Sequence, residues 1–300
     1  MKTSTDDTPS RPKFVGLGEL LWDVFPDGAR LGGAGTNFVV MSAFLGAEAV
    51  LVSRIGDDAD GHRSVEMLSG WGLDIRFIQV DDSRATGTVL VTVEDGEPSY
   101  EIVEGVAWDV IAWEPELETQ VQEADVLYFG TIIQREETSR ETVQRLIAGV
   151  SDRCLKVLDL NFRQHYHSQE VVRTSVGLSD ILKLNVDEVP ILRQYLGGVD
   201  DPTSFCRDIR ERFQICQVVL TMGAGGCRVF GPEGDVEVPA APQKVVNTVG
   251  AGDAFTAAFV LHHLQGADAR TCAERANEVG GYVTTQDGGT PRLPASFSVF

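Results

Sequence analysis

Two glycines and a single carboxylate stand together in the stretch VVNTVGAGDAFTAAFV, residues 245–260, between an apolar run and a helical pattern. Gly250 and Gly252 would let the backbone turn so that successive N–H groups at the start of the helix point outward, which makes an anion site. Asp253 in this position either caps the helix or acts as a general base within hydrogen-bond reach of a hydroxyl. The stretch by itself leaves both interpretations open.

A second stretch, GGAGTNF at residues 32–38, combines small residues with one amide side chain. Its glycines permit a ligand to approach the backbone closely, and Asn37 offers both a hydrogen-bond donor and an acceptor. A helix that begins here explains Thr36 or Asn37 as an N-cap equally well. Ligand binding and helix capping are therefore alternatives for this stretch.

The stretch LDLNFRQHYH follows an apolar strand pattern and carries three polar residues at alternate positions. Because side chains alternate between the two faces of a strand, Asp159, Asn161 and Arg163 are expected on one face near the end of the strand. The planar guanidinium of Arg163 suits a phosphate or a carboxylate. A surface ion pair is the alternative interpretation of Arg163.

Two further strand ends carry polar or glycine-rich sequence, LKLNVDEV and VVLTMGAGGC. Asn185 and Glu188 could organise a hydrated Mg²⁺, which keeps several waters and takes few protein ligands. The same pair also fits the start of a helix. In the second sequence Thr221 precedes a glycine-rich turn. Ligands of parallel α/β sheets bind at such strand ends, so both sequences are candidate site segments.

Composition excludes several other classes of function. The formal net charge of −20 argues against nucleic acid, because its phosphates need clustered Lys and Arg. Scattered cysteines without a CxxC pair, and histidines without partners at metal spacing, disfavour a zinc site. No uncharged apolar run approaches the roughly 18 to 20 residues of a membrane span, and the P-loop and GxSxG signatures are absent. We therefore expect a cytoplasmic protein with small-molecule ligands and without nucleic-acid or membrane partners.

The elements that must position these residues alternate along the chain. KFVGLGELLWDVFP predicts a strand ending in glycines, and TNFVVMSAFLGAEAVLVSRIG predicts a helix, a glycine stop and a second strand. From residue 125 onward strands and helices alternate, and the chain ends in two helical patterns around 254–263 and 270–283. This alternation predicts an α/β fold with a doubly wound, mostly parallel sheet flanked by helices.

We expect residues 13–300 to form a single α/β domain, because no linker long enough to separate two domains interrupts the chain. The segments at about 20–31 and 84–106 depart from the alternation and predict a small β-sheet lid. An Asp-Gly dipeptide at 95–96 suits a tight hairpin, since both positions tolerate positive φ. The polar residues 1–12 predict a disordered leader.

Taken together, GGAGTN, DLNFR, NVDE, TMGAGG and NTVGAGDAF resemble the motifs of the ribokinase-like family of carbohydrate kinases, in order and spacing over nearly the whole chain. GAGD is the most specific of these motifs, and GGAGTN stands about 210 residues upstream of it. The resemblance implies a doubly wound sheet, a β lid over a sugar site, ATP as phosphoryl donor and Mg²⁺ as a cofactor. Within the family, GELLWD, DLNFR and SYEIVEGVAWD look most like a fructokinase-like member.

The resemblance also implies a role for each matching residue. Asp253 would be the general base and the backbone of Gly250, Ala251 and Gly252 the anion hole, with Arg163 as a further catalytic residue. The expected sugar-binding residues are Asp23, Gly33, Asn37, Asn161, Arg163 and Asp253. The expected nucleotide-binding residues are Asn185, Thr221, Gly223, Gly226, Gly250, Gly252 and Asn277. Asn185 and Glu188 would hold Mg²⁺ through water.

One position departs from the family's pattern. The first residue of NTVGAGD is Asn247, where the family usually has an Asp that helps to bind an activating monovalent cation in several members. The amide can still offer an oxygen but contributes no charge. The resemblance therefore leaves K⁺ activation open.

The implied reaction is phosphorylation of a small sugar at a primary hydroxyl, with D-fructose at O6 as the expected substrate. A sugar-acid kinase acting on 2-keto-3-deoxygluconate is the alternative, and Arg163 could then serve the carboxylate. An alternative of another class is a catalytically weak sugar-binding or regulatory module on the kinase fold. Lids in this family often pair edge to edge, which implies a homodimer through the lid.

Overall fold

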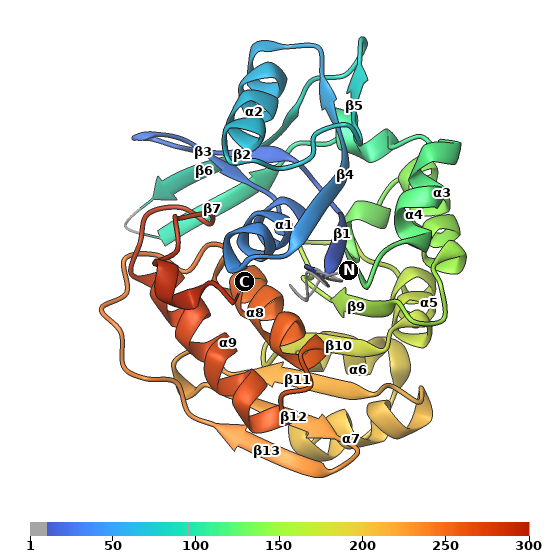
Figure 1. Ribbon diagram of the computed structural model, residues 1–300, viewed down its shortest axis with the longest axis vertical. Coiled ribbons are helices and arrows are strands. Elements are labelled where there is room, and N and C mark those ends of the chain that lie inside the picture. The colour runs from blue at the N-terminus through green and yellow to red at the C-terminus, as the bar shows by residue number, and fades with distance from the viewer. Residues whose placement is uncertain (1–10, 95–96, 300) are drawn as a thin grey trace, which may run out of the picture.

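The computed structural model describes residues 11–94 and 97–299, which form one large sheet, a small second sheet and the helices that cover the large one (Figure 1). The large sheet has nine strands in the order β13-β12-β11-β10-β9-β8-β1-β4-β5. Its strands are β1 Lys13–Leu17, β4 Glu48–Gly56, β5 Ile78–Asp81, β8 Val126–Gly130, β9 Leu155–Asp159, β10 Ile181–Asn185, β11 Gln217–Thr221, β12 Cys227–Gly231 and β13 Gly234–Val238. Neighbouring strands from β5 to β11 are parallel, while β12 and β13 add antiparallel pairs at one edge. The predicted mostly parallel sheet is confirmed.

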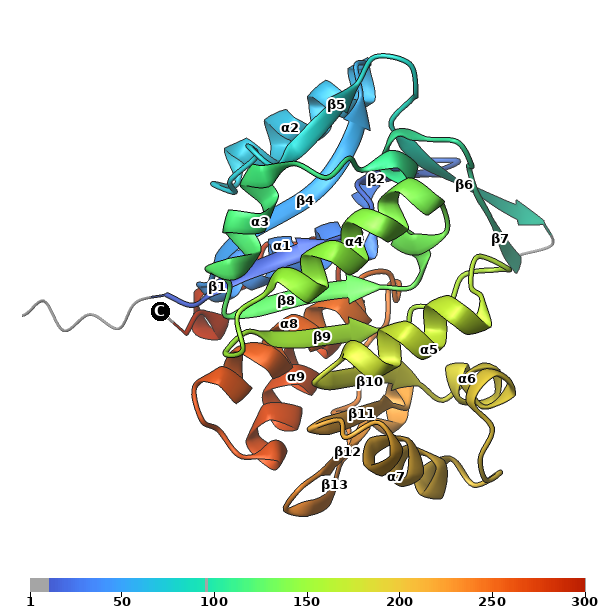
Figure 2. The same ribbon diagram turned by 90° about the vertical axis from the view of Figure 1, so that its right-hand side faces the viewer.

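Helices cover both faces of this sheet, which makes it doubly wound (Figure 2). One face carries α1 Ala34–Leu45, α2 Ala59–Gly70, α8 Ala251–Leu264 and α9 Ala269–Thr284. The other carries α3 Pro115–Gln122, α4 Glu137–Gly149, α5 Gln169–Leu178, α6 Glu188–Leu196 and α7 Pro202–Arg212. Within the described ranges, no helix combines the length and the apolar character needed to cross a membrane.

Two hydrophobic cores result, one on each face of the large sheet. Successive side chains of a strand point to opposite faces. Phe14 of β1 therefore packs in the core that contains α1, α8 and α9, and Val15 packs in the core that contains α3 to α7. Strands buried on both faces need continuous apolar runs, which is why β1 and β8 contain almost no polar residues.

The end of α1 and the start of α8 are both marked by glycines. Gly46 follows α1 with φ of 109°, a left-handed conformation that glycine adopts without strain, so the predicted glycine stop is confirmed. The two helices expected near the C-terminus are present as α8 and α9. Helix α8 begins at Ala251, earlier than its apolar pattern indicates, and this places Asp253 in the first turn.

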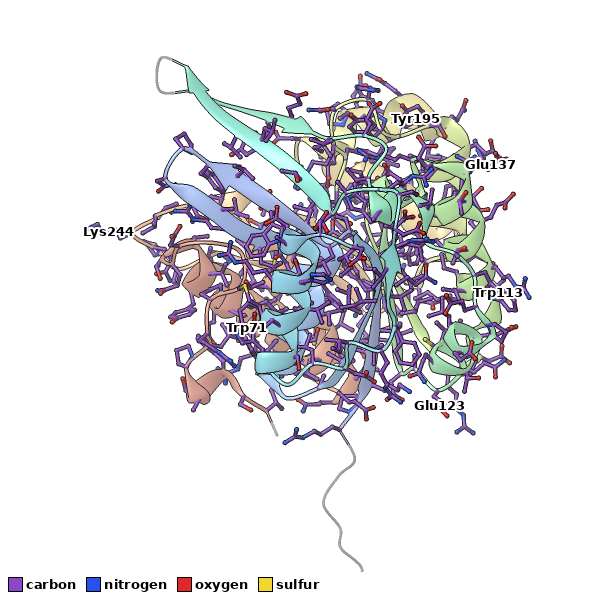
Figure 3. All side chains as sticks on the ribbon, turned by 90° about the horizontal axis from the view of Figure 1, so that it is seen from above. Trp71, Trp113, Glu123, Glu137, Tyr195 and Lys244 are labelled. Atoms are coloured by element: carbon purple, nitrogen blue, oxygen red, sulfur yellow. The ribbon has the colours of Figure 1, made fainter. Side chains whose placement is uncertain are left out.

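The small sheet has the order β3-β2-β6-β7, with β2 Leu21–Phe25, β3 Gly28–Gly32, β6 Gly87–Glu94 and β7 Glu97–Ile102. Its strands come from the two segments expected to form a lid, and β3 extends one residue past 31. Seen from above, the hairpins project beyond the body of the molecule (Figure 3). The register pairs Glu94 with Glu97, but the expected turn at 95–96 and residues 1–10 of the expected leader lie outside the described residues.

Candidate functional site

A cavity of about 720 Å³ lies between the small sheet and the carboxyl ends of β9 and β10. This volume is in the range of small-molecule sites, and the location is where parallel α/β sheets bind ligands. The structure brings together in its lining most of the residues predicted from sequence: Asp23, Gly33, Asn37, Asn161, Arg163, Asn185, Gly250, Gly252 and Asp253.

Asp253 does not cap its helix. Gly250 is the N-cap of α8, and no side chain bonds to the free N–H groups there. The carboxylate of Asp253 is buried and accepts a hydrogen bond from Nδ2 of Asn37 over 2.9 Å. The capping alternative is therefore wrong, and Asp253 is held at the cavity by a residue of another helix.

Neither Thr36 nor Asn37 caps α1. Gly33 is the N-cap, with φ of 102°, and a Cβ on it would lie 2.1 Å from the carbonyl oxygen of Glu19. The hydroxyl of Thr36 instead donates to that carbonyl over 2.8 Å. Asn37 lines the cavity, and its Oδ1 is buried with no hydrogen-bond partner among the described residues.

The pKa of Asp253 is raised to about 7. Burial is the main cause and the nearby charge of Asp159 adds to it, while Asn37, Lys183 and Arg163 act in the opposite direction. A carboxylate with a pKa near 7 is well matched to accept a proton at neutral pH. Asp23, across the cavity, has its pKa raised to about 6 by burial.

The start of α8 offers backbone N–H groups to an anion. Gly250 has φ of 74°, and a Cβ on it would lie 2.5 Å from the backbone of Gly289, so glycine is required on both counts. A Cβ on Gly252 would lie 3.1 Å from Nζ of Lys183. Gly250 and Gly252 line the cavity, whereas Ala251 does not, and any part of Ala251 in an anion hole would be through its N–H group.

The expected alternation of Asp159, Asn161 and Arg163 along one strand face is wrong. Strand β9 ends at Asp159, and Asn161 adopts φ of 44°, which breaks the strand geometry. Asn161 and Arg163 still line the cavity, but Asp159 turns to Lys183. Across the residues that the structure describes, Arg163 forms no ion pair, so the surface ion pair is not found and its guanidinium is available to a ligand.

Asn185 and Glu188 form the helix start that the sequence left as an alternative. Oδ1 of Asn185 accepts from the N–H of Glu188 over 3.0 Å, and Oε2 of Glu188 accepts from the N–H of Asn185 over 2.8 Å. The remaining oxygen, Oε1, accepts from the N–H of Phe162 over 3.0 Å. Glu188 is buried and outside the cavity lining, whereas Asn185 lines it.

The donor set fits Mg²⁺ only through water. No cluster of three or more His, Cys, Asp or Glu side chains that could hold a metal occurs in residues 11–94 and 97–299. Asn185 lines the cavity, but its Oδ1 already accepts from the N–H groups of Asp187 and Glu188, and both Glu188 oxygens are likewise bonded to backbone. Mg²⁺ keeps several waters and is usually carried by phosphates, so an outer-sphere site here is consistent with these residues.

The other expected nucleotide-binding residues lie outside the cavity lining. Thr221 ends β11, and its hydroxyl donates to the carbonyl of Leu184 over 3.3 Å. Gly223 and Gly226 form the turn that follows, with φ of 55° and 91°. Asn277 of α9 donates to the carbonyl of Val238 over 3.1 Å, and a Cβ on Gly226 would clash with the same carbonyl. Gly226 and Asn277 thus meet at the end of β13, and their contact with a nucleotide remains a prediction.

Two charged residues at the cavity were missed from sequence. Lys183 is buried in β10, and its Nζ lies 3.0 Å from Oδ2 of Asp159. Glu19 is buried, and its Oε1 accepts from the N–H of Ala34 over 3.0 Å, which fixes the start of α1. The available signal was a charged residue inside an otherwise apolar run, as in ILKLN, because charges are buried only with a partner or a function.

Comparison with known proteins agrees with this geometry. The family described as pfkB family carbohydrate kinase matches residues 19–296. A sugar kinase of Pyrococcus horikoshii, PH1459, is 32% identical over 276 residues, which are 87% of this chain and 83% of that protein. The fructokinase of Klebsiella pneumoniae is 27% identical over 256 residues, which are 81% of this chain and 82% of that protein.

Solved structures of such proteins have the same fold. The structure of PH1459 in complex with ATP superposes with a TM-score of 0.77 at 28% identity, over 92% of this chain and 94% of that chain. Fructokinase from Vibrio cholerae O395, bound to fructose, ADP and calcium, superposes with a TM-score of 0.80 at 25% identity, over 95% and 97% of the two chains. This chain therefore belongs to the pfkB family of carbohydrate kinases.

Proposed function

We propose that this carbohydrate kinase transfers the γ-phosphate of ATP to O6 of D-fructose, with Asp253 as the general base. The observation that carries the proposal is the hydrogen bond from Asn37 to Asp253 at a cavity bordered by the first turn of α8. Phosphoryl transfer asks the protein mainly for positioning, charge stabilisation and a base near the acceptor hydroxyl, and this arrangement offers all three.

In the proposed step, a carboxylate oxygen of Asp253 accepts the proton of the sugar hydroxyl while the hydroxyl oxygen of the sugar attacks the γ-phosphorus. The bond from the γ-phosphorus to the bridging oxygen breaks, and its electron pair leaves with ADP. The N–H groups at the start of α8 and the guanidinium of Arg163 would stabilise the negative charge on the phosphoryl oxygens. Mg²⁺ bound to the phosphates would neutralise charge there, and Asn185, which lines the cavity, would contact its waters.

The charges around the cavity favour a neutral sugar. Glu19, Asp23 and Asp253 contribute carboxyl groups to the lining, while Lys183 is already paired with Asp159. A sugar acid such as 2-keto-3-deoxygluconate would bring a further negative charge among these groups. Arg163 favours this second candidate, because its guanidinium lines the cavity without an ion pair within the described part of the chain and could bind the carboxylate of the sugar acid.

A screen for ADP release tests the substrate directly. Fructose, 2-keto-3-deoxygluconate, ribose, adenosine and tagatose would each be supplied with ATP and Mg²⁺, and we expect the highest kcat/KM for fructose. A higher kcat/KM for 2-keto-3-deoxygluconate would instead identify the protein as the sugar-acid kinase. Sugar binding without ADP release from any of them would indicate the regulatory module instead.

We also propose that the small sheet serves as a lid and pairs with a second copy to form a homodimer. Strands β3 and β7 are the edges of this sheet, and unpaired edges favour pairing with another chain. Light scattering at working concentration tests this proposal. A mass near twice 32.6 kDa is expected, and a monomer would refute it.

A further inference from the structure

The segment that follows α9, at the red end of the chain in Figure 1, contacts both the small sheet and the start of α8. Arg30 of β3 donates from Nε to Oδ1 of Asp287 over 2.8 Å. The two residues are far apart in sequence, and the bond connects an edge strand of the small sheet to an exposed residue that is followed by the buried Gly288 and Gly289. Both nitrogens at the tip of the same guanidinium donate to Asp27, which lies in the β2–β3 turn.

The turn beyond Asp287 packs directly against the catalytic groups. A Cβ on Gly289 would lie 3.0 Å from both Nδ2 and Oδ1 of Asn37, so the Asn37 amide rests on this glycine. Gly289 also packs against Gly250, where a Cβ would lie 2.5 Å from its backbone. A shift of the turn would therefore move both the N-cap of α8 and the donor that holds Asp253.

The opposite edge of the small sheet is tied to a different part of the site. Nε2 of Gln164 donates to the carbonyl of Tyr100 in β7 over 2.6 Å, and the hydroxyl of Tyr166 lies 3.2 Å from the carbonyl oxygen of Ile102 and 2.7 Å from Oε1 of Glu104. Gln164 and Tyr166 belong to the loop that carries Arg163, and both follow it in sequence. The β7 edge thus contacts the loop that carries Arg163, whereas the β3 edge contacts the segment after α9 through the ion pair of Arg30 with Asp287 and also continues along the chain into Gly33 and α1.

We propose that Arg30 and Asp287 are positioning residues, which couple closure of the lid over the sugar to the placement of Asn37 and the α8 N-terminus. The inference rests on the proposed function, since it assigns the pair a part in phosphoryl transfer. Neither residue lines the cavity, so the effect acts through Gly289. The side chain of Asp287 is 66% exposed, and an exposed ion pair is a modest and salt-sensitive coupling.

The chain offers a matched control for this pair. Asp27 is bound to the same guanidinium and its side chain is 71% exposed, but it belongs to the lid alone. Asp287→Asn should raise the KM for the sugar and lower kcat, so that kcat/KM falls by about two- to fivefold. Asp27→Asn should leave both kcat and KM unchanged. Arg30→Gln should match Asp287→Asn, and the double variant should be no worse than either, because all three lose the pair with Asp287 and the further loss of the Asp27 bonds is expected to be silent. The deficit should shrink at high salt.

Hydrogen exchange separates this inference from the proposed function, because it needs no turnover. In Asp287→Asn the amides of residues 249–254 and 28–32 should exchange faster than in the unaltered protein, and in Asp27→Asn those of 249–254 should not. Unaltered exchange at 249–254 in Asp287→Asn, or equal kinetic effects of the two substitutions, would overturn the coupling. Failure of the unaltered protein to phosphorylate any sugar would instead refute the proposed function and leave the exchange result to decide whether the coupling exists.

Discussion

Asn37 of α1 donates a hydrogen bond to Asp253 of α8 over 2.9 Å, and this contact joins residues separated by 216 positions in the chain. It brings the motifs GGAGTN and NTVGAGDAF to one point of the cavity. The second amide atom of Asn37, Oδ1, is buried and has no hydrogen-bond partner among the described residues. Through its Nδ2 bond, Asn37 holds the proposed base at the cavity.

The pH dependence of kcat/KM should report the ionisation of Asp253. Its pKa is raised to about 7, chiefly by burial, and a base must be ionised before it accepts a proton. Activity should therefore fall as pH drops through about 7 and level off above it. Because the bond from Asn37 lowers this pKa, Asn37→Ala should move the limb to higher pH, and Ser42→Ala in the same helix should not. A limb that stays in place in Asn37→Ala would contradict this origin.

The buried ion pair of Lys183 with Asp159 should make the two residues interdependent in their effect on the free energy of unfolding. Their side chains are 9% and 1% exposed, so Lys183→Met leaves a buried carboxylate without its partner and should cost about 3 kcal/mol of unfolding free energy. Adding Asp159→Asn should recover most of this loss. Lys156→Met, which breaks a pair with Asp180 near the surface, should cost less than about 1 kcal/mol. Urea unfolding of the three variants and the unaltered protein measures these losses, and equal losses for Lys183→Met and Lys156→Met would contradict the dependence.

Glu188 should act on the backbone and not on the metal. Both of its oxygens accept from backbone N–H groups, of Phe162 and Asn185. Glu188→Gln turns one of these acceptors into a donor facing an N–H group, which should cost about 1 to 3 kcal/mol of stability. The Mg²⁺ concentration for half-maximal rate should stay unchanged, as it should in the exposed neighbour Asp187→Asn. A Mg²⁺ requirement that rises severalfold in Glu188→Gln alone would restore this residue as a metal ligand.

Activity should not require K⁺. The side chain of Asn247 is occupied within the protein, since Nδ2 donates to the carbonyl of Gln286 over 3.1 Å and Oδ1 accepts from the N–H of Val249 over 3.0 Å. Without a charge at this position, a cation gains little there. Rates in potassium and tetramethylammonium salts should be equal at matched ionic strength. A severalfold higher rate in K⁺ would show that the cation is still bound.

Much of the fold was predictable because its signals are local or periodic. The alternation of apolar strands with helical patterns specifies the doubly wound sheet, and Gly46 specifies the end of α1. The residues of the cavity followed from the motifs at strand ends. The order of the motifs could not, however, reveal that Asn37 and Asp253 are in contact.

The errors arose where distant contacts override local patterns. The strand was expected to continue to Arg163, but Asn161 turns the chain at φ of 44°, and Glu188 holds the N–H of Phe162 from 26 residues away. Lys183 was missed because a lysine in a strand shows its role only when its partner, Asp159, is known. The sequence marks Lys183 only as a charge inside an apolar run, and it names neither the partner of Lys183 nor that of Phe162.

Replacing Asp253 with Asn tests the central claim most directly. The amide keeps the shape of the side chain but cannot accept the proton of the sugar hydroxyl. Turnover with ATP and fructose should fall by roughly 10² or more, while fructose binding measured by calorimetry stays within about threefold of the unaltered protein. Unchanged turnover in Asp253→Asn would contradict the account.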